Sequence, residues 1–273
     1  MPDDNGAAES STDKDSLGRI LLVALGVCFV CSIFVSFTAV ALKPAQLANK
    51  ALDQKQNVLR AAGLLGEGRS EGAKGESVDE LFSAFEAVAV ELDSGSVLPS
   101  FDAASYDPLR AAKDPQTSME LSPDQDIATI GRREDIAVAY VLRTSGGELD
   151  KVVLPVRGYG LWGTLYGYLA LEGDLTTIAG IGFYEQKETP GLGGEVDNPN
   201  WKALWPGTRL FNDSGEPQVA LVKSRSAAGS TAAAYEVDAL SGATFTTRGV
   251  ENLVNFWTGE LAFGPYLKQL ASS

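Results

Sequence analysis

The run Thr164-Leu165-Tyr166-Gly167-Tyr168-Leu169-Ala170-Leu171 directly follows Gly158-Tyr159-Gly160-Leu161-Trp162-Gly163. Whether this run forms a helix or a strand decides whether the domain can have a dinucleotide-binding fold. The glycine-rich segment has the G-x-G-x-x-G spacing of dinucleotide-binding motifs, which require a helix next. The run that follows is instead rich in Leu and Tyr, as strands are. Glu185 follows the segment at about the sequence separation at which dinucleotide-binding motifs have an acidic residue that contacts the ribose. Without the helix, however, we do not expect a Rossmann fold. The glycine-rich segment is then either a connection between strands or a loop that contacts a ligand.

The chain around this run alternates strand-like and helix-like segments. A polar, Asp- and Pro-rich stretch reaches from about residue 94 to about 136, and Gly66 to Glu76 forms a Gly-rich linker. Many strands followed by helices indicate an α+β domain with a mixed sheet/helix architecture. The predicted strands are 137–143, 151–157, 164–172, 177–185 and 217–223, and the predicted helices are 46–65, 77–93 and 247–261.

The composition excludes several kinds of chemistry. The chain of 273 residues has no histidine, which excludes Ser-His-Asp catalysis, His-ligated zinc and proximal-His haem. Its only cysteines, Cys28 and Cys31, lie in an apolar run and are interpreted as packing residues, so we expect no disulfide, iron–sulfur or metal site. The net charge of −14 argues against nucleic-acid binding. Redox chemistry would therefore need an organic cofactor.

One segment is long and apolar enough to cross a membrane. Ile20–Leu42 contains no charged residue, and at about 1.5 Å per residue it spans a hydrocarbon core of about 30 Å. The alternative is a secretory signal peptide, because Ala39-Val40-Ala41 resembles a cleavage site. We expect a disordered cytoplasmic tail over 1–18, a transmembrane helix over 19–42, a juxtamembrane helix and linker over 43–76, and a domain over 77–273. The flanking Lys and Arg residues, taken alone, place that domain in the cytoplasm.

Two further motifs carry candidate chemistry. Glu188-Thr189-Pro190-Gly191-Leu192-Gly193-Gly194 is either a turn or a loop whose backbone approaches a ligand. Asp238-Ala239-Leu240-Ser241-Gly242-Ala243-Thr244 places small residues before a hydroxyl at the start of a predicted helix, where free N–H groups and the helix dipole favour a phosphoryl group. Arg248 follows in the first turn. The plain alternative is a helix cap formed by Thr246 or Thr247.

These motifs resemble a known family. Asp238-x-x-Ser241-Gly242-Ala243-Thr244 is similar to the flavinylation motif of FMN-binding domains, in which a flavin transferase couples FMN to the final Thr. Four other segments resemble the C subunits of sodium-translocating NADH:quinone reductases, and the resemblance covers about residues 19–262. These segments are Gly160–Gly167, Glu188–Gly194, Val27–Ser32 and Leu52–Gln56.

The resemblance implies a cofactor site with one covalent FMN per chain, attached to Thr244, and no catalytic residue or metal ligand. Tyr159 or Trp162 would lie near the isoalloxazine ring, and Lys223 and Asp238 fall where the family has polar residues near the flavin. The implied cofactor-binding residues are Thr244, Ser241, Gly242, Ala243, Asp238, Tyr159, Leu161, Trp162, Glu188, Thr189, Gly191, Leu192, Lys223 and Arg248.

The resemblance also implies a function. The chain would be the electron-transfer component of a bacterial inner-membrane complex that oxidises NADH, reduces ubiquinone and exports sodium. Its partners would be the other subunits, a flavin transferase and the membrane, and its flavin domain would lie on the periplasmic side, in conflict with the flanking charges. Two alternatives stay open: the G subunit of the related ferredoxin/NADH electron-transport complex, and a cofactor-free, membrane-tethered binding protein.

Overall fold

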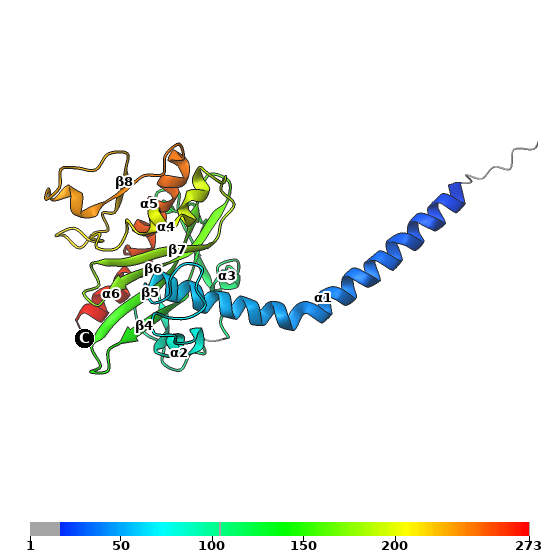
Figure 1. Cartoon of the computed structure of the whole chain (residues 1–273), viewed down its shortest axis with the longest axis horizontal. Helices are drawn as coiled ribbons and strands as arrows, with labels where there is room; N and C mark the ends of the chain where they lie inside the picture. Colours follow the sequence, from blue (N-terminus) through cyan, green and yellow to red (C-terminus); the bar gives the residue numbers. More distant parts are fainter. Residues whose placement is uncertain (1–16, 104, 273) are drawn as a thin grey trace, which may run out of the picture. The chain divides into compact units, whose positions relative to one another are not determined.

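The computed structural model describes residues 17–103 and 105–272, which contain a long helix and a domain built on a five-stranded sheet (Figure 1). They group into two compact units, one up to Ala51 and one over Leu52–Ser273. The strands are β1 (Phe85–Glu91), β2 (Ser118–Glu120), β3 (Arg132–Glu134), β4 (Ile136–Arg143), β5 (Leu149–Tyr159), β6 (Thr164–Glu172), β7 (Ile178–Glu185), β8 (Ala220–Val222) and β9 (Glu236–Asp238). The helices are α1 (Leu17–Ala61), α2 (Val78–Ser83), α3 (Pro108–Ala111), η1 (Gly193–Asp197), α4 (Pro199–Lys202), η2 (Ala232–Tyr235), α5 (Thr244–Thr258) and α6 (Gly264–Ala271).

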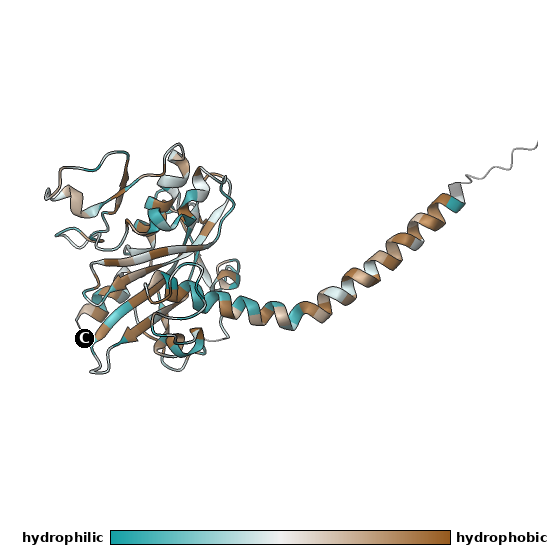
Figure 2. Cartoon of the chain, viewed as in Figure 1, coloured by the Kyte–Doolittle hydropathy of each residue, from teal (hydrophilic) through white to brown (hydrophobic). Residues whose placement is uncertain are grey.

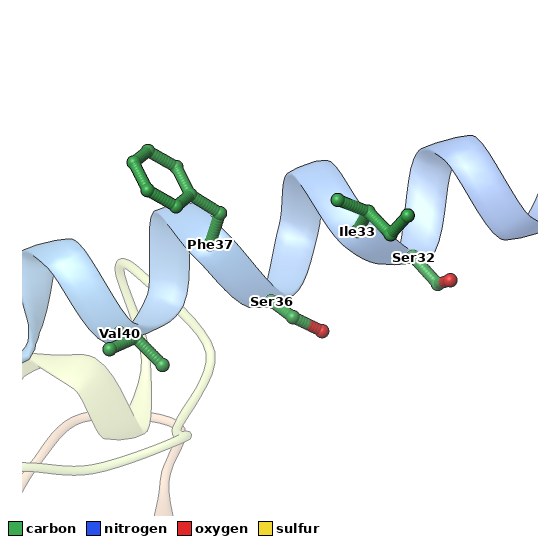
Figure 3. Close-up of a pocket in the computed structure, with 5 residues that line it drawn as sticks. All are labelled: Ser32, Ile33, Ser36, Phe37 and Val40. Carbon is green, nitrogen blue, oxygen red and sulfur yellow. The ribbon is translucent and has the colours of Figure 1, made fainter.

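Helix α1 contains the predicted anchor. Among the described residues it is the one helix long and apolar enough to cross a membrane, and Figure 2 shows brown, apolar residues along its first part. Ser32, Ile33, Ser36, Phe37 and Val40 line a shallow hollow on its surface (Figure 3). Residues 17 and 18, which we expected to be disordered, begin this helix, while residues 1–16 of the expected tail lie outside the described residues.

The main sheet is antiparallel, with strand order β1-β4-β5-β6-β7. Its central strands are paired over long stretches; Leu154 faces Leu169, and Leu169 faces Ile181. An antiparallel sheet flanked by helices confirms the α+β prediction. It also confirms that a strand, β6, follows the G-x-G-x-x-G segment.

Each face of the sheet carries its own apolar core. On one face, α5 packs against β5 and contributes Leu253, Val254 and Trp257, all almost fully buried. On the other face, Val58 and Leu59 near the end of α1 are fully buried against the sheet. The helix predicted over 46–65 is therefore the end of α1, and it fills a core of the domain.

Tyrosines add polar groups to the second face. Tyr140 accepts a 2.6 Å hydrogen bond from the side chain of Gln54, and its ring lies edge-on to that of Tyr168. Burial raises the pKa of both tyrosines, so both hydroxyls remain protonated at neutral pH. The end of α1 is thus held on the sheet by a polar contact as well as by apolar packing.

A buried ion pair joins the small β2–β3 sheet to the main sheet. Arg157 on β5 donates to both carboxylate oxygens of Glu134 on β3, at 2.8 and 2.5 Å. The guanidinium lies 4.8 Å from the centre of the Trp257 ring, whose Nε1–H donates to the backbone carbonyl of Arg157 at 2.7 Å. Both charged side chains are more than nine-tenths buried. This pair therefore fixes β3, β5 and the end of α5 relative to one another.

One predicted helix is wrong and others shift. The segment 77–93 begins as a helix, because Ser77 and Glu80 form a capping box, but α2 ends at Ser83 and the next residues form β1. Phe85–Glu91 contains one Phe and two Val, which favour strands, and it pairs along its whole length with β4. This pairing outweighs the helix propensity of its other residues. The polar stretch 94–136 contains α3, β2 and β3, the strand predicted over 217–223 is β8, and the helix predicted over 247–261 starts at Thr244.

Candidate cofactor site

Thr244 is the first residue of α5, and it is exposed to solvent. The residue before it, Ala243, is the N-cap, and within the described chain no side chain caps this end of the helix. Thr246 and Thr247, the alternative caps, lie inside the helix and are buried. The plain-cap interpretation is therefore wrong, and the first N–H groups of α5 point at the Thr244 end without a side-chain acceptor.

A tight turn holds the segment before Thr244. Gly242 has φ +73°, a left-handed conformation that favours glycine. The hydroxyl of Thr247 accepts a hydrogen bond from the backbone N–H of Leu240 at 3.2 Å, so the helix itself fixes the start of the turn. A Cβ on Gly242 would lie 3.1 Å from Leu192 Cδ2, which places the Glu188–Gly194 loop beside this turn.

Glu188 joins the three predicted motifs. Its side chain is buried, with 5% of the residue exposed. Oε1 accepts hydrogen bonds from the backbone N–H groups of Leu161 and Trp162 at 3.0 and 2.9 Å, and Oε2 accepts one from the hydroxyl of Thr246 at 2.5 Å. One carboxyl group thus joins its own loop, after β7, to the glycine-rich loop after β5 and to the first turn of α5.

Glycines permit the close approach of these segments. A Cβ on Gly160 would lie 2.6 Å from Glu188 Oε1, and one on Gly249 of α5 would lie 2.4 Å from the carbonyl oxygen of Tyr159. A Cβ on Gly193 would lie 2.4 Å from Thr246 Oγ1. Since real Cβ atoms do not approach so closely, a side chain at Gly249 would displace the backbone, and one at Gly160 or Gly193 would displace Glu188 or Thr246.

Replacing Gly193 with alanine is expected to separate the loop from α5. The added methyl group would overlap Thr246 Oγ1 and Glu188 Oε2, and overpacking of this kind lowers the free energy of unfolding by about 1–3 kcal/mol. Denaturant unfolding of the full-length protein in detergent measures the loss. Gly182→Ala is the matched control, because a Cβ there meets no atom within 4 Å. Equal stabilities of the two variants would contradict the close contact.

Several apolar side chains of the three motifs and of the first turn of α5 face solvent. Trp162 is 64% exposed and Phe245 is 64% exposed, although aromatic side chains are usually buried. Tyr159, Leu161 and Leu192 are each close to half exposed. Thr189 and Gly191 lie on the same loop as Leu192 and are also exposed. We call these exposed residues the rim; they stand on the first turn of α5, which begins with Thr244, and on the loops that Glu188 joins to that turn.

Two of the predicted polar residues lie at the ends of the parallel pair β8–β9. Lys223 directly follows β8, and Asp238 ends β9 opposite Val222. Asp238 forms a 3.4 Å ion pair with Arg225, and its backbone carbonyl accepts a 2.8 Å hydrogen bond from Trp201 Nε1–H. Helix α5 holds β8 from its other side, as Glu251 and Asn255 bond the backbone of Leu221 and Val219.

Arg225, which pairs with Asp238, is not indicated by any of the sequence motifs. Its partner Asp238 lies 13 positions further along the chain, and only the parallel pairing of β8 with β9 brings the two together. Arg248 and Ser241 are both exposed, and Arg248 lies one turn after Thr244 on α5.

The residues present fit a flavin mononucleotide. An exposed hydroxyl stands at an uncapped helix N-terminus, which suits a phosphate. Exposed Leu161, Trp162 and Leu192 offer the flat apolar contacts that a ring system needs, and they stand on loops fixed by Glu188.

Comparisons with known proteins show which proteins this chain resembles. Residues 160–259 match the family model of the FMN-binding domain. The chain is 50% identical over 259 residues to a Pseudomonas aeruginosa protein named as the C subunit of the Na(+)-translocating NADH-quinone reductase, covering 94% of this chain and 97% of that one. It is 43% identical to the protein of the same name from Yersinia pestis, covering 97% of each chain. The crystal structure of Shewanella oneidensis NqrC is similar with a TM-score of 0.72 and 37% identity, over 82% of this chain and 100% of that chain.

Proposed function

The chain belongs to the family of C subunits of the Na(+)-translocating NADH-quinone reductase, and from this premise we propose that Thr244 carries its FMN. The protein is the FMN-containing electron-transfer component of that complex, and the other subunits are its partners. It shares in an oxidoreductase activity that belongs to the whole assembly. The near-complete coverage of relatives that are C subunits favours this function over the G subunit of the related complex and over a cofactor-free binding protein.

The exposed hydroxyl of Thr244 carries the proposal for the attachment point. An ester between Thr244 Oγ1 and the FMN phosphate would hold the phosphate at the N-terminus of α5, where the helix dipole favours negative charge. Gly242 and Ala243 leave room on one side because their side chains are absent or small. FMN supplies electron transfer in steps of one or two electrons.

We propose that the exposed residues of the rim provide the other contacts to FMN. Leu161, Trp162 and Leu192 would flank the ring system, with Tyr159 beside them. Ser241, Thr189 and Gly191 would bind from the two loops nearest Thr244, with Glu188 behind them. Lys223 and Arg248 would supply positive charge near the cofactor, and Asp238 would hold the strand that leads into the attachment turn.

Fluorescence of the denatured protein tests the attachment. The full-length chain is expressed together with a flavin transferase, which the proposal requires for maturation, and separated on a denaturing gel. We expect a flavin-fluorescent band at the mass of the chain, since a covalent bond survives denaturation. A protein that folds but shows no fluorescent band would contradict covalent FMN.

The protein is membrane-anchored, and we propose that its domain lies on the periplasmic side of a bacterial inner membrane. The candidate span in α1 and the family support the anchor. A fusion of alkaline phosphatase to the C-terminus tests the side, because this enzyme is active only after export. High activity supports the periplasmic domain, and activity at the level of a cytoplasmic control would contradict it.

A further inference from the structure

The carboxyl group of Glu188 is buried without a cation. Eight ion pairs occur among the described residues, and Glu188 takes part in none of them. The neighbouring Lys187 is exposed and lays its aliphatic chain against Gly163. A buried carboxylate without a cation costs free energy unless hydrogen bonds compensate for the lost water.

Oriented dipoles compensate for this charge. Two backbone N–H groups point at Oε1, and the Thr246 hydroxyl donates to Oε2. Thr246 lies in the first turn of α5, at the positive end of the helix dipole. These three donors replace hydrogen bonds that the carboxylate oxygens would otherwise form with water.

A structural clamp alone would not need this charge. A glutamine at position 188 has the same shape, its carbonyl accepts two N–H bonds, and its amide donates to a threonine hydroxyl, which rotates to accept. Glutamine would also avoid the cost of burying a charge. The hydrogen bonds of the clamp alone therefore do not account for the negative charge of Glu188.

We propose that Glu188 is a positioning residue whose buried negative charge lowers the redox potential of the flavin at this site. The inference rests on the proposed function. Glu188 binds the backbone of Leu161 and Trp162, whose side chains form the rim, and it binds the helix turn that begins with Thr244. Each electron delivered to the site adds negative charge there, and a fixed negative charge behind the rim opposes it.

The test compares Glu188→Gln with Thr246→Val in the full-length, flavin-loaded protein. The first variant removes the charge and retains three hydrogen bonds, with the direction of the bond to Thr246 reversed. The second retains the charge and removes one of the three hydrogen bonds. Redox titration followed by flavin absorbance gives the midpoint potential, and thermal unfolding gives the stability.

We expect Glu188→Gln to raise the equilibrium constant for one-electron reduction by on the order of tenfold, which corresponds to about 59 mV. Thr246→Val is expected to change that constant by less than about twofold while lowering stability, since a single hydrogen bond contributes about 1 kcal/mol. A Glu188→Gln potential equal to that of the wild type, or an equal shift in both variants, would overturn the inference.

A second measurement covers the case in which Glu188→Gln does not fold or load flavin. Infrared difference spectra of reduced minus oxidised protein, with isotope-labelled glutamate, detect carboxylates that sense the flavin charge. We expect a labelled carboxylate band in the wild type that is displaced in Thr246→Val. Absence of such a band would also overturn the inference. A wild-type protein without covalent flavin contradicts the proposed function, whereas loaded Glu188→Gln with an unchanged potential contradicts only this inference.

Discussion

Replacing Thr244 with valine is expected to abolish covalent flavin while leaving the protein folded. Valine has nearly the shape of threonine, and it lacks the hydroxyl oxygen to which the phosphate would be joined. Because Thr244 is exposed and its side chain caps nothing, its removal should change the free energy of unfolding by no more than about 0.5 kcal/mol. The fluorescence of the denatured band should fall to background.

Ser241→Ala is the matched control for this result. Ser241 is the other exposed hydroxyl of the attachment segment, three residues before Thr244. Its loss should leave the fluorescent band in place. If the band persisted in Thr244→Val and disappeared in Ser241→Ala, the attachment would be at Ser241. Circular dichroism of each variant establishes that the chain has folded.

Replacing Glu134 with alanine is expected to cause the largest loss of stability. The substitution leaves the Arg157 guanidinium buried without its partner, and breaking a buried pair in this way costs about 3–5 kcal/mol. The β2–β3 sheet and the end of α5 would lose their common contact, because Arg157 also packs on Trp257. Denaturant unfolding of the full-length protein, followed by tryptophan fluorescence, measures the effect.

Glu120→Ala supplies the comparison for a surface pair. Glu120 bonds Arg132 at 3.1 Å on the same small sheet, but its side chain is 80% exposed. Exposed pairs contribute about 0–1 kcal/mol. Similar losses in the two variants would show that burial of the Glu134 pair carries no special weight.

Local pattern was enough to predict the central sheet. The segments that form β4, β5, β6 and β7 are rich in Val, Ile, Leu and Tyr. Turns that contain glycine or acidic residues separate them. The run after Gly163 was the most informative, because a strand there excludes the dinucleotide-binding fold. These elements agree with the prediction since their propensity, periodicity and tertiary pairing all favour the same conformation.

Long-range pairing explains what the sequence did not reveal. Phe85–Glu91 has residues that suit either a helix or a strand, and its partner β4 lies about fifty positions away. Val58 and Leu59 lie in the segment predicted as a juxtamembrane helix, whereas the structure buries them fully in a core against the sheet. At the site, the motifs suggested a ligand, but neither the Glu188 clamp nor the Arg225–Asp238 pair has a local signal.

The position of α5 in the chain has a consequence for the order of maturation. This helix helps to cover the apolar face of the main sheet, and it comes after all five strands of that sheet in the chain. During synthesis, the strands β1 to β7 exist before α5 can pack on that face, so this core closes only after α5 has been made. Thr244 gains its surroundings in the same event. The folded conformation of Asp238–Thr244 therefore exists only in a completed domain. An enzyme that recognises this segment in the folded state would not modify truncated or misfolded chains.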